Sequence, residues 1–414
     1  MFAHHARVLL FHVVWFFSIK DRMNIYIVLL FCFVFSFLSC GSKTSMEKKE
    51  MKQTPGETIS IEIKTNDINR ETGAHGVISC TSYISLSDEI LLNKIRRVLI
   101  SDDCIYILDS SPKIVCFNKN GEAIYSIDQR GAGPKEFANI IDFSIDKKNK
   151  QLVTYDSGKR RLSFYNMITG VYLYDKPITY ISPNRICITP EGFFFHTPDH
   201  FNYPKQKEKH FFLFYSSDGA DIDASYLPHD AISEYYFGMG DGHPFFHNEP
   251  HPLYNKPFDS KVYILENGGI TPFLDISLPN FLPMEKIAGK IDPVVLSRSD
   301  YSFGLTDFYI ANNVLHFSFS KEGYIQTAFF DLANDRLLYC GTRVSDVPTR
   351  NLPLYSIISG TSGKHFFSIV YPEQILQRME SHPDLIPRQL KNVLEDDNPV
   401  LVFYEIIEKG GGGR

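Results

Sequence analysis

Histidines form the densest group of residues that could do chemistry. Half of the 14 histidines fall between His196 and His251, and the stretch GDGHPFFHNEPHP spaces His243, His247 and His251 by four residues. The same stretch holds Asp241, Glu249, Pro244, Pro250 and Pro252. On a helix, this histidine spacing would align the imidazoles toward one metal ion. Because the three prolines oppose a helix, we expect the side chains to diverge unless a loop folds them together, and we assign no metal ligand.

Acidic side chains cluster at three predicted turns or helix ends. They are Asp102-Asp103, Asp221 with Asp223, and Glu395-Asp396-Asp397. Acids at such positions accept hydrogen bonds from backbone amides, and no partner acid or base can be assigned to them. The chain contains no G-x-S-x-G elbow, and Gly131 and Gly133 lack the third glycine and following helix of a dinucleotide site. We therefore assign no catalytic residue and no cofactor.

Aromatic runs could offer a stacking platform for sugars or peptides. The runs are GFFFH, HFFLFY and EYYFGMG. Alternating aromatic residues in strands more often form core, and Trp15, the only tryptophan, lies in the leader. Long loops in compact folds tend to carry function, so the Gly- and Pro-broken segment 232–252 is where we expect a ligand face.

Cys40 is the one residue with an assigned modification. The apolar run MNIYIVLLFCFVFSFLSC starts at Met23 and ends at Cys40, which suits a signal peptide better than a membrane span. Its end, Phe37-Leu38-Ser39-Cys40, resembles the lipobox of bacterial lipoproteins, in which the cysteine thiol receives a diacylglyceryl group and becomes the first residue. An ordinary cysteine after an uncleaved anchor is the alternative. Multiple acyl chains would hold the protein stably at a membrane.

The chain therefore divides into four predicted parts. Residues 1–40 are a signal peptide with a lipobox, 41–56 a flexible polar tether, 57–408 the folded domain and 409–414 a disordered tail. Residues 1–22 reflect either an early start codon before Met23 or an extended leader. The net charge of −6 gives no basic field, so no nucleic-acid partner is expected.

Five further cysteines, Cys80, Cys104, Cys116, Cys187 and Cys340, follow Cys40. They show no paired C-x-x-C spacing of a zinc site. Cys104 and Cys116 flank a predicted hairpin and could meet across it. We expect them to be reduced, with a disulfide as the alternative.

Two stretches repeat and predict how these residues are positioned. Residues 104–127 and 151–174 each contain a strand that ends in Asp (Asp109, Asp156), a polar turn, a second strand, a turn with Gly121 or Gly170, and a third strand. The Asp carboxylate can accept the amides of the turn, and Gly supplies positive φ where the chain reverses. The distance between the two aspartates is near the period of four-stranded propeller blades.

Fainter copies continue to residue 407 and predict an all-β, six-bladed β-propeller. Residues 58–65 or 82–88 could close the ring by completing the blade begun by PVLVFYEII. Residues 373–397 have helical spacing broken by Pro383 and Pro387, which predicts short helices inserted in the last blade.

The stretch RGAGPKEF, followed by Asp146 and by Asp156, Arg161 and Tyr165, resembles an NHL-type repeat. More closely, most of the chain is similar to six-bladed β-propeller lipoproteins of Gram-negative bacteria, a family without a settled activity. The resemblance implies a lipid-anchored propeller and transfers no catalytic residue.

Two functions follow as expectations. The first is a non-catalytic module that binds a peptide, glycan or protein. Its lipid would hold it in the cell envelope, at the periplasmic or surface face of the outer membrane. The alternative is a metal-dependent envelope lyase or hydrolase with a histidine-lined central channel, because NHL-like enzymes hold a metal through histidines from several blades.

Overall fold

The computed structural model describes residues 58–69, 78–101, 104–197, 211–228, 243–283, 286, 292–342 and 357–407. The chain divides into two units, residues 1–48 and 49–414, and every described residue belongs to the second. Within the described ranges, no helix is both long and apolar enough to cross a membrane. The predicted signal peptide with Cys40, the tether and the tail lie outside the described residues.

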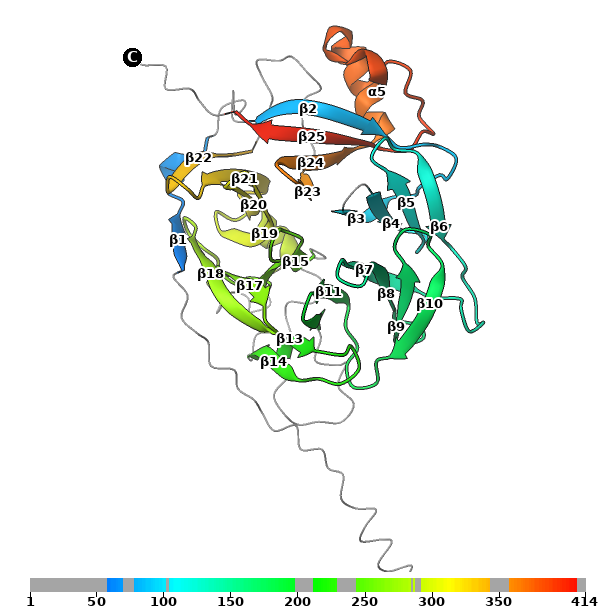
Figure 1. Cartoon of the computed structure of the whole chain (residues 1–414). Helices are drawn as coiled ribbons and strands as arrows, with labels where there is room; N and C mark the ends of the chain where they lie inside the picture. The colour runs from blue at the N-terminus through cyan, green and yellow to red at the C-terminus, as the bar shows by residue number, and fades with distance from the viewer. Residues whose placement is uncertain are drawn as a thin grey trace, which may run out of the picture. The chain divides into compact units, whose positions relative to one another are not determined.

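Six small β-sheets surround one axis, which confirms the predicted six-bladed propeller (Figure 1). Blade 1 contains β3 (Ile95–Ser101), β4 (Cys104–Asp109), β5 (Ile114–Asn118) and β6 (Ala123–Ile127). Blade 2 contains β7 (Ile140–Asp146), β8 (Gln151–Asp156), β9 (Arg161–Asn166) and β10 (Tyr172–Pro177). Blade 3 contains β11 (Arg185–Thr189), β12 (Gly192–His196), β13 (Phe211–Ser216) and β14 (Ala224–Pro228).

The second half of the ring repeats this order from inner to outer strand. Blade 4 contains β15 (Phe245–Phe246), β16 (Leu253–Asn255), β17 (Lys261–Glu266) and β18 (Gly269–Ser277). Blade 5 contains β19 (Ser302–Ala311), β20 (Val314–Lys321), β21 (Tyr324–Asp331) and β22 (Arg336–Gly341). Blade 6 contains β23 (Ile358–Ser362), β24 (His365–Val370), β25 (Val400–Ile406) and, from the other end of the chain, β2 (Ile78–Ser85). Each inner strand contacts the inner strand of the next blade, and β23 contacts β3, so the ring is closed.

The repeated aspartates work as predicted. Asp109 accepts the amides of Asn93 and Ser111. Asp156 accepts those of Ala138, Asn139 and Gly158. Each carboxylate therefore joins the turn after its own strand to the connection that enters its blade, and this explains why the repeat places Asp there.

Closure uses the second of the two predicted segments. Strand β2 pairs antiparallel with β25, with Tyr83 opposite Val402 and Ile84 opposite Leu401. The earlier segment instead forms β1 (Ile59–Glu62), which pairs parallel with β18 on the outside of blade 4. Asn69 then bridges to Gly341 of blade 5. The amino-terminal segment thus runs along three blades and covers two outer edges that would otherwise be unpaired.

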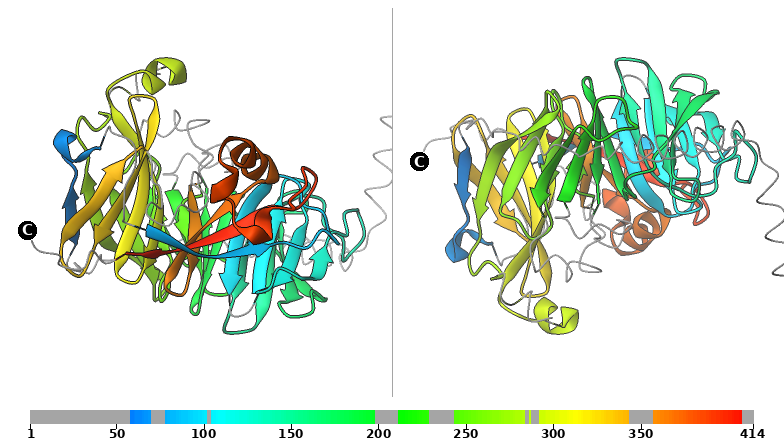
Figure 2. Two further views of the ribbon diagram at one scale, coloured as in Figure 1. Left: turned by 90° about the horizontal axis from the view of Figure 1, so that it is seen from above. Right: turned by 90° about the horizontal axis from the view of Figure 1, so that it is seen from below.

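Short helices stand on the connections of the last blades (Figure 2). As predicted, α5 (Pro372–Ser381) and the 3-10 turns η4 (Pro383–Leu385) and η5 (Arg388–Leu390) lie between β24 and β25. The buried side chains of Ile375 and Leu390 join the core of blade 6. The sequence prediction missed α4 (Pro293–Ser297), which begins with the Asp292 carboxylate accepting the Val294 amide. A further 3-10 turn, η1 (Thr65–Asp67), follows β1.

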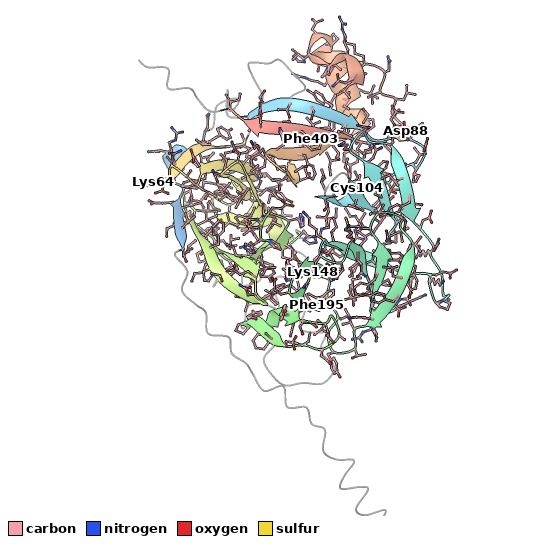
Figure 3. All side chains as sticks on the ribbon, in the orientation of Figure 1. Lys64, Asp88, Cys104, Lys148, Phe195 and Phe403 are labelled. Atoms are coloured by element: carbon pink, nitrogen blue, oxygen red, sulfur yellow. The ribbon has the colours of Figure 1, made fainter. Side chains whose placement is uncertain are left out.

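The predicted aromatic core is confirmed for the described runs. Side chains fill the spaces between neighbouring sheets (Figure 3). Phe195 packs in the cluster between blades 2 and 3, and Phe403 in the one between blades 6 and 1. The strand residues of GFFFH are all buried, so this run offers no stacking platform; EYYFGMG lies outside the described residues.

Candidate functional site

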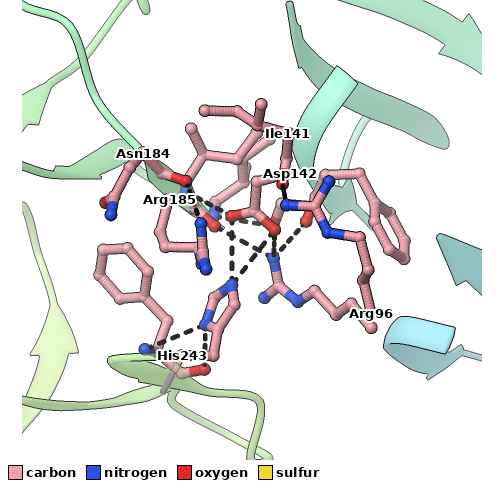
Figure 4. Close-up of polar contacts among 12 residues, drawn as sticks. Arg96, Ile141, Asp142, Asn184, Arg185 and His243 are labelled. Carbon is pink, nitrogen blue, oxygen red and sulfur yellow. Dashed lines mark hydrogen bonds and ion pairs between the residues drawn. The ribbon is translucent and has the colours of Figure 1, made fainter. Parts of the chain in front are cut away.

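A polar cluster lies where the first four inner strands begin. It contains Arg96 of β3, Asp142 of β7, Arg185 of β11 and His243, which directly precedes β15 (Figure 4). Arg97 of β3 joins them through its ion pair with Asp142. We call this group the axial site. Four blades contribute to it, so its geometry depends on the closed ring rather than on any one sheet.

Asp142 is the centre of the axial site, and its carboxylate is fully engaged. Oδ1 accepts a 2.7 Å hydrogen bond from Arg97 Nη1, and Oδ2 accepts one of 2.7 Å from the Ile186 amide. His243 Nε2 lies 3.2 Å from both carboxylate oxygens. Burial alone would raise the pKa of Asp142, but Arg97 and His243 hold that pKa well below its usual range. Asp142 is therefore a buried, charged, structural group.

Arg97 connects three blades through one nitrogen. Its Nη1 donates to Asp142, to the Phe143 carbonyl oxygen and, at 3.5 Å, to that of Ile186. The guanidinium carbon also lies 5.6 Å from the Phe143 ring centroid, a cation–π contact. The side chain is 9% exposed, and its Nε and Nη2 hold no hydrogen bond with a described residue.

His243 reaches Asp142 from blade 4, across the edge of blade 3. Burial and the charge of Arg97 lower the pKa of His243 to about 4, so the ring is neutral near pH 7. The neutral ring can donate from Nε2 to Asp142 and accept the Phe245 amide at Nδ1, 3.2 Å away. His243 is therefore a positioning residue for Asp142 in this geometry.

Two more arginines add positive charge. Arg96 donates from Nη2 to the Ile141 carbonyl oxygen at 3.2 Å, and Arg185 donates from Nη1 to that of Asn184 at 2.8 Å. Among the described residues, the axial site thus combines three guanidinium groups with the Asp142 carboxylate and the neutral imidazole of His243.

The other predicted histidines lie apart, in agreement with the expected divergence. His251 Nε2 is 3.8 Å from Glu266 Oε2 on β17, and Glu249 pairs with Lys147. The pKa of His247 is lowered to about 4 by burial and by the charge of Lys147. Asp241 lies outside the described residues, and among those described no three His, Cys, Asp or Glu side chains gather as metal ligands would.

One acid of each described acidic cluster accepts a backbone amide. Asp223 Oδ2 accepts the Ser217 amide, and Asp397 Oδ2 accepts that of Leu394. Asp102 and Asp103 lie outside the described residues. None of the five described cysteines forms a disulfide bond, so Cys104 and Cys116 are reduced, as expected.

The two faces of the propeller are unequal. Connections between the first and second strands, and between the third and fourth, are short turns such as 312–313 and 363–364. Connections at the opposite end, where the inner strands begin, include 128–139, 278–301 and 371–399 with their helices. We call this end the long-loop face. The axial site lies at its centre, because the inner strands start there.

Exposed apolar side chains also gather on the long-loop face. Of the thirteen large exposed hydrophobic side chains in the described ranges, eight lie on its connections or at the strand ends beside them: Leu91, Tyr180, Val294, Val295, Tyr324, Ile325, Ile357 and Leu394. The other five lie on the outer strands β6 and β10 and the turn before β10: Ile124, Ile168, Val171, Leu173 and Tyr174. The long-loop face therefore carries most of the large exposed apolar side chains of the described ranges.

Sequence reasoning missed Arg97, Asp142 and Arg185. Arg97 and Asp142 are 45 residues apart, close to one blade repeat, and each is the third residue of its inner strand. Charged residues that recur at this position were the available signal, because equivalent positions of successive inner strands meet at the axis.

The fold and the axial site together define a six-bladed β-propeller with an arginine-rich centre. The chain belongs to the family described as a domain of unknown function, DUF4934, whose profile matches residues 58–405. A comparison with curated proteins gave no match.

Solved structures share the fold. A Bacteroides fragilis protein described as a "Putative exported protein" is 18% identical, with a TM-score of 0.68, and the match covers 85% of this chain and 100% of that one. A Bacteroides vulgatus member of the DUF4221 family is 9% identical, with a TM-score of 0.45 over 80% of this chain and 99% of its own. The first match supports the propeller fold, and the second is too distant to support a conclusion.

Proposed function

We propose that the protein is a lipid-anchored propeller of the cell envelope that binds a peptide, glycan or protein partner without catalysis. The sequence around Cys40 supports the anchor, and the exported description of the Bacteroides fragilis protein with the same fold supports an extracytoplasmic location. The outer membrane, at its periplasmic or surface face, remains our prediction for the site of anchoring.

One observation carries the binding role: long connections, exposed apolar side chains and the axial site coincide on the long-loop face. Connections carry function because a rigid scaffold holds them while their sequence is free to vary. A polar group and exposed apolar side chains on one face supply the two elements of a ligand site, in which a few polar groups fix orientation and apolar area supplies affinity.

A pair of matched variants tests the binding face. Leu394→Ser with Tyr324→Ser removes two exposed apolar side chains from the long-loop face, whereas Ile168→Ser with Val171→Ser removes two from the outer edge of blade 2. The full-length chain and both variants are incubated with envelope glycans, peptides and proteins, and retained material is quantified. We expect weaker retention by the first variant alone. Equal retention by all three chains would contradict the proposal.

The anchor has its own test. Cells that express the wild-type chain or Cys40→Ser are grown with an alkyne-tagged palmitate, and the label on the protein is measured. We expect label on the wild type and none on the variant. Label that persists on Cys40→Ser, or that is missing from both chains, would contradict lipidation at Cys40.

No observation favours the alternative, a metal-dependent lyase or hydrolase with a histidine-lined channel. Among the described residues, His243 is engaged by Asp142 and Phe245, while His251 lies beside Glu266 on another strand. The binding role is therefore the one we develop.

A further inference from the structure

We infer that the axial site binds an oxyanion, a carboxylate or phosphate group, on the ligand of the long-loop face. This inference deepens the proposed binding function by naming the chemistry that the ligand must present. It rests on the charge balance of the site, on the unused edge of Arg97 and on the way Asp142 is shielded.

The charge balance favours an anion. Among the described residues, Arg96 and Arg97 lie beside one carboxylate, that of Asp142, and guanidinium groups remain charged at any physiological pH. Concentrating like charge at one point is unfavourable unless a counter-charge arrives. Because the site lies among low-dielectric sheets, an anion there is attracted more strongly than it would be by the same arginines in open solvent.

The geometry of Arg97 favours a planar or tetrahedral oxyanion. Its Nη1 is occupied by Asp142 and two carbonyl oxygens, which fix the plane of the guanidinium. Nε and Nη2, the other edge, hold no hydrogen bond with a described residue. Two parallel N–H donors on a fixed edge match the two oxygens of a carboxylate or phosphate.

Asp142 does not compete for this edge. Its oxygens are already met by Arg97, the Ile186 amide and His243. The side chain is only 2% exposed, so a ligand that approaches from the long-loop face meets the arginines rather than the carboxylate. His243 has 22% of its side chain exposed and marks the solvent side of the pair. Asp142 therefore holds Arg97 in place without neutralising the whole site.

Calorimetric titration of the full-length chain tests the inference with three oxyanion probes. Glucuronate represents an acidic glycan, the dipeptide Ala-Ala with a free carboxyl end represents a peptide, and inorganic phosphate represents a phosphoryl group. Glucose and amidated Ala-Ala are the uncharged controls. We expect saturable binding of at least one oxyanion, weakened by added salt, and none of its neutral control.

Variants assign the binding to the site. Arg97→Lys keeps the charge beside Asp142 but loses the two parallel N–H donors of the guanidinium, and should lower the affinity for the oxyanion probe about tenfold. Arg96→Gln and Arg185→Gln leave the Arg97–Asp142 pair intact and should each lower the affinity for the probe several-fold. These two variants keep the test valid if Arg97→Lys does not fold. Arg336→Gln, an exposed position at the start of β22, is the matched control and should bind like the wild type.

The outcomes separate this inference from the proposed function. No saturable binding of any probe, or binding that all four variants weaken equally, would overturn the oxyanion site. Partner retention that depends on Leu394 and Tyr324 would still support the binding face in that case. If partner retention did not depend on Leu394 and Tyr324 but oxyanions still bound, the proposed binding face would be overturned and the oxyanion site would stand.

Discussion

Arg97 and Asp142 form an ion pair of 2.7 Å between adjacent blades, with side chains 9% and 2% exposed. Because Arg97 also contacts a carbonyl oxygen of blade 3, the pair joins three inner strands at one point. An ion pair so deeply buried is stabilising only as a pair, since either charge left alone would be buried without compensation.

Breaking that pair should therefore be costly. Asp142→Asn or Arg97→Gln should each lower the free energy of unfolding by about 3–5 kcal/mol. The double variant should lose less than the sum of the two, because no charge is left unpaired. Lys64→Gln, which breaks the exposed pair with Glu62, should cost at most about 1 kcal/mol. Urea unfolding measures all four, and additive losses in the double variant would contradict the coupling.

Stability should fall as the pH is lowered from 6.5 to 4. Burial lowers the pKa values of His243, His247 and His316 to about 4, so in this window the unfolded chain binds protons that the folded protein does not. Each histidine adds a slope of up to about 1.4 kcal/mol per pH unit. Asp307, whose pKa burial raises to about 7, opposes them because its folded form is the one that binds a proton there.

Two variants check the sign of this dependence by urea unfolding at pH 7, 6 and 5. His316→Phe removes one buried imidazole and should make the free energy of unfolding depend less on pH. Asp307→Asn removes the opposing group and should make the free energy of unfolding fall more steeply on acidification. Stability that rises on acidification of the wild type would contradict the assignment.

Gly121 should resist substitution. It has φ of +85° in the turn between β5 and β6, and a Cβ there would lie 2.1 Å from the Ser85 carbonyl oxygen of β2. Gly121→Ala should lower the free energy of unfolding by about 2 kcal/mol or more, through backbone strain and the displacement of β2. Gly363 has φ of +58°, and a Cβ there would meet no described atom within 4 Å, so Gly363→Ala should cost only about 1 kcal/mol. Equal thermal shifts would contradict the steric argument.

Ring closure should depend on β2 and not on β1. A chain that begins at residue 70 loses β1 but keeps the pairing of β2 with β25, and should unfold cooperatively with reduced stability. A chain that begins at residue 87 loses β2 as well and exposes β25, so it should aggregate or lose cooperativity. Circular dichroism during urea titration distinguishes the two, and identical curves would be evidence against closure by β2.

The fold could be predicted because its rules are local. Asp109 and Asp156 fix the turn after a strand, and alternating apolar residues fix which side faces a neighbouring blade. The closing strand remained ambiguous, because both amino-terminal segments alternate suitably and only the contacts of the folded ring select between them. The helix α4 was missed because it has only five residues, beginning with Pro293.

The axial site was harder to predict because its members are distant in sequence. His243 attracted attention through its spacing from His247 and His251, yet its partner Asp142 is 101 residues away. Arg97 and Asp142 are ordinary charged residues in their own strands, and they become a site only when the blades surround the axis. The recurrence of charged residues at equivalent positions of successive inner strands could have suggested them, whereas no local motif contains them both.

The path of the first described residues has a mechanical consequence. Strand β1 is held along blade 4 by its pairing with β18 and by the buried side chain of Ile61, and Asn69 bridges to blade 5 before β2 enters blade 6. Tension applied through the amino-terminal end of the chain therefore loads β1 first. This strand can detach while β2 and β25 keep the ring closed, so a pulled molecule would lengthen before its long-loop face is disturbed.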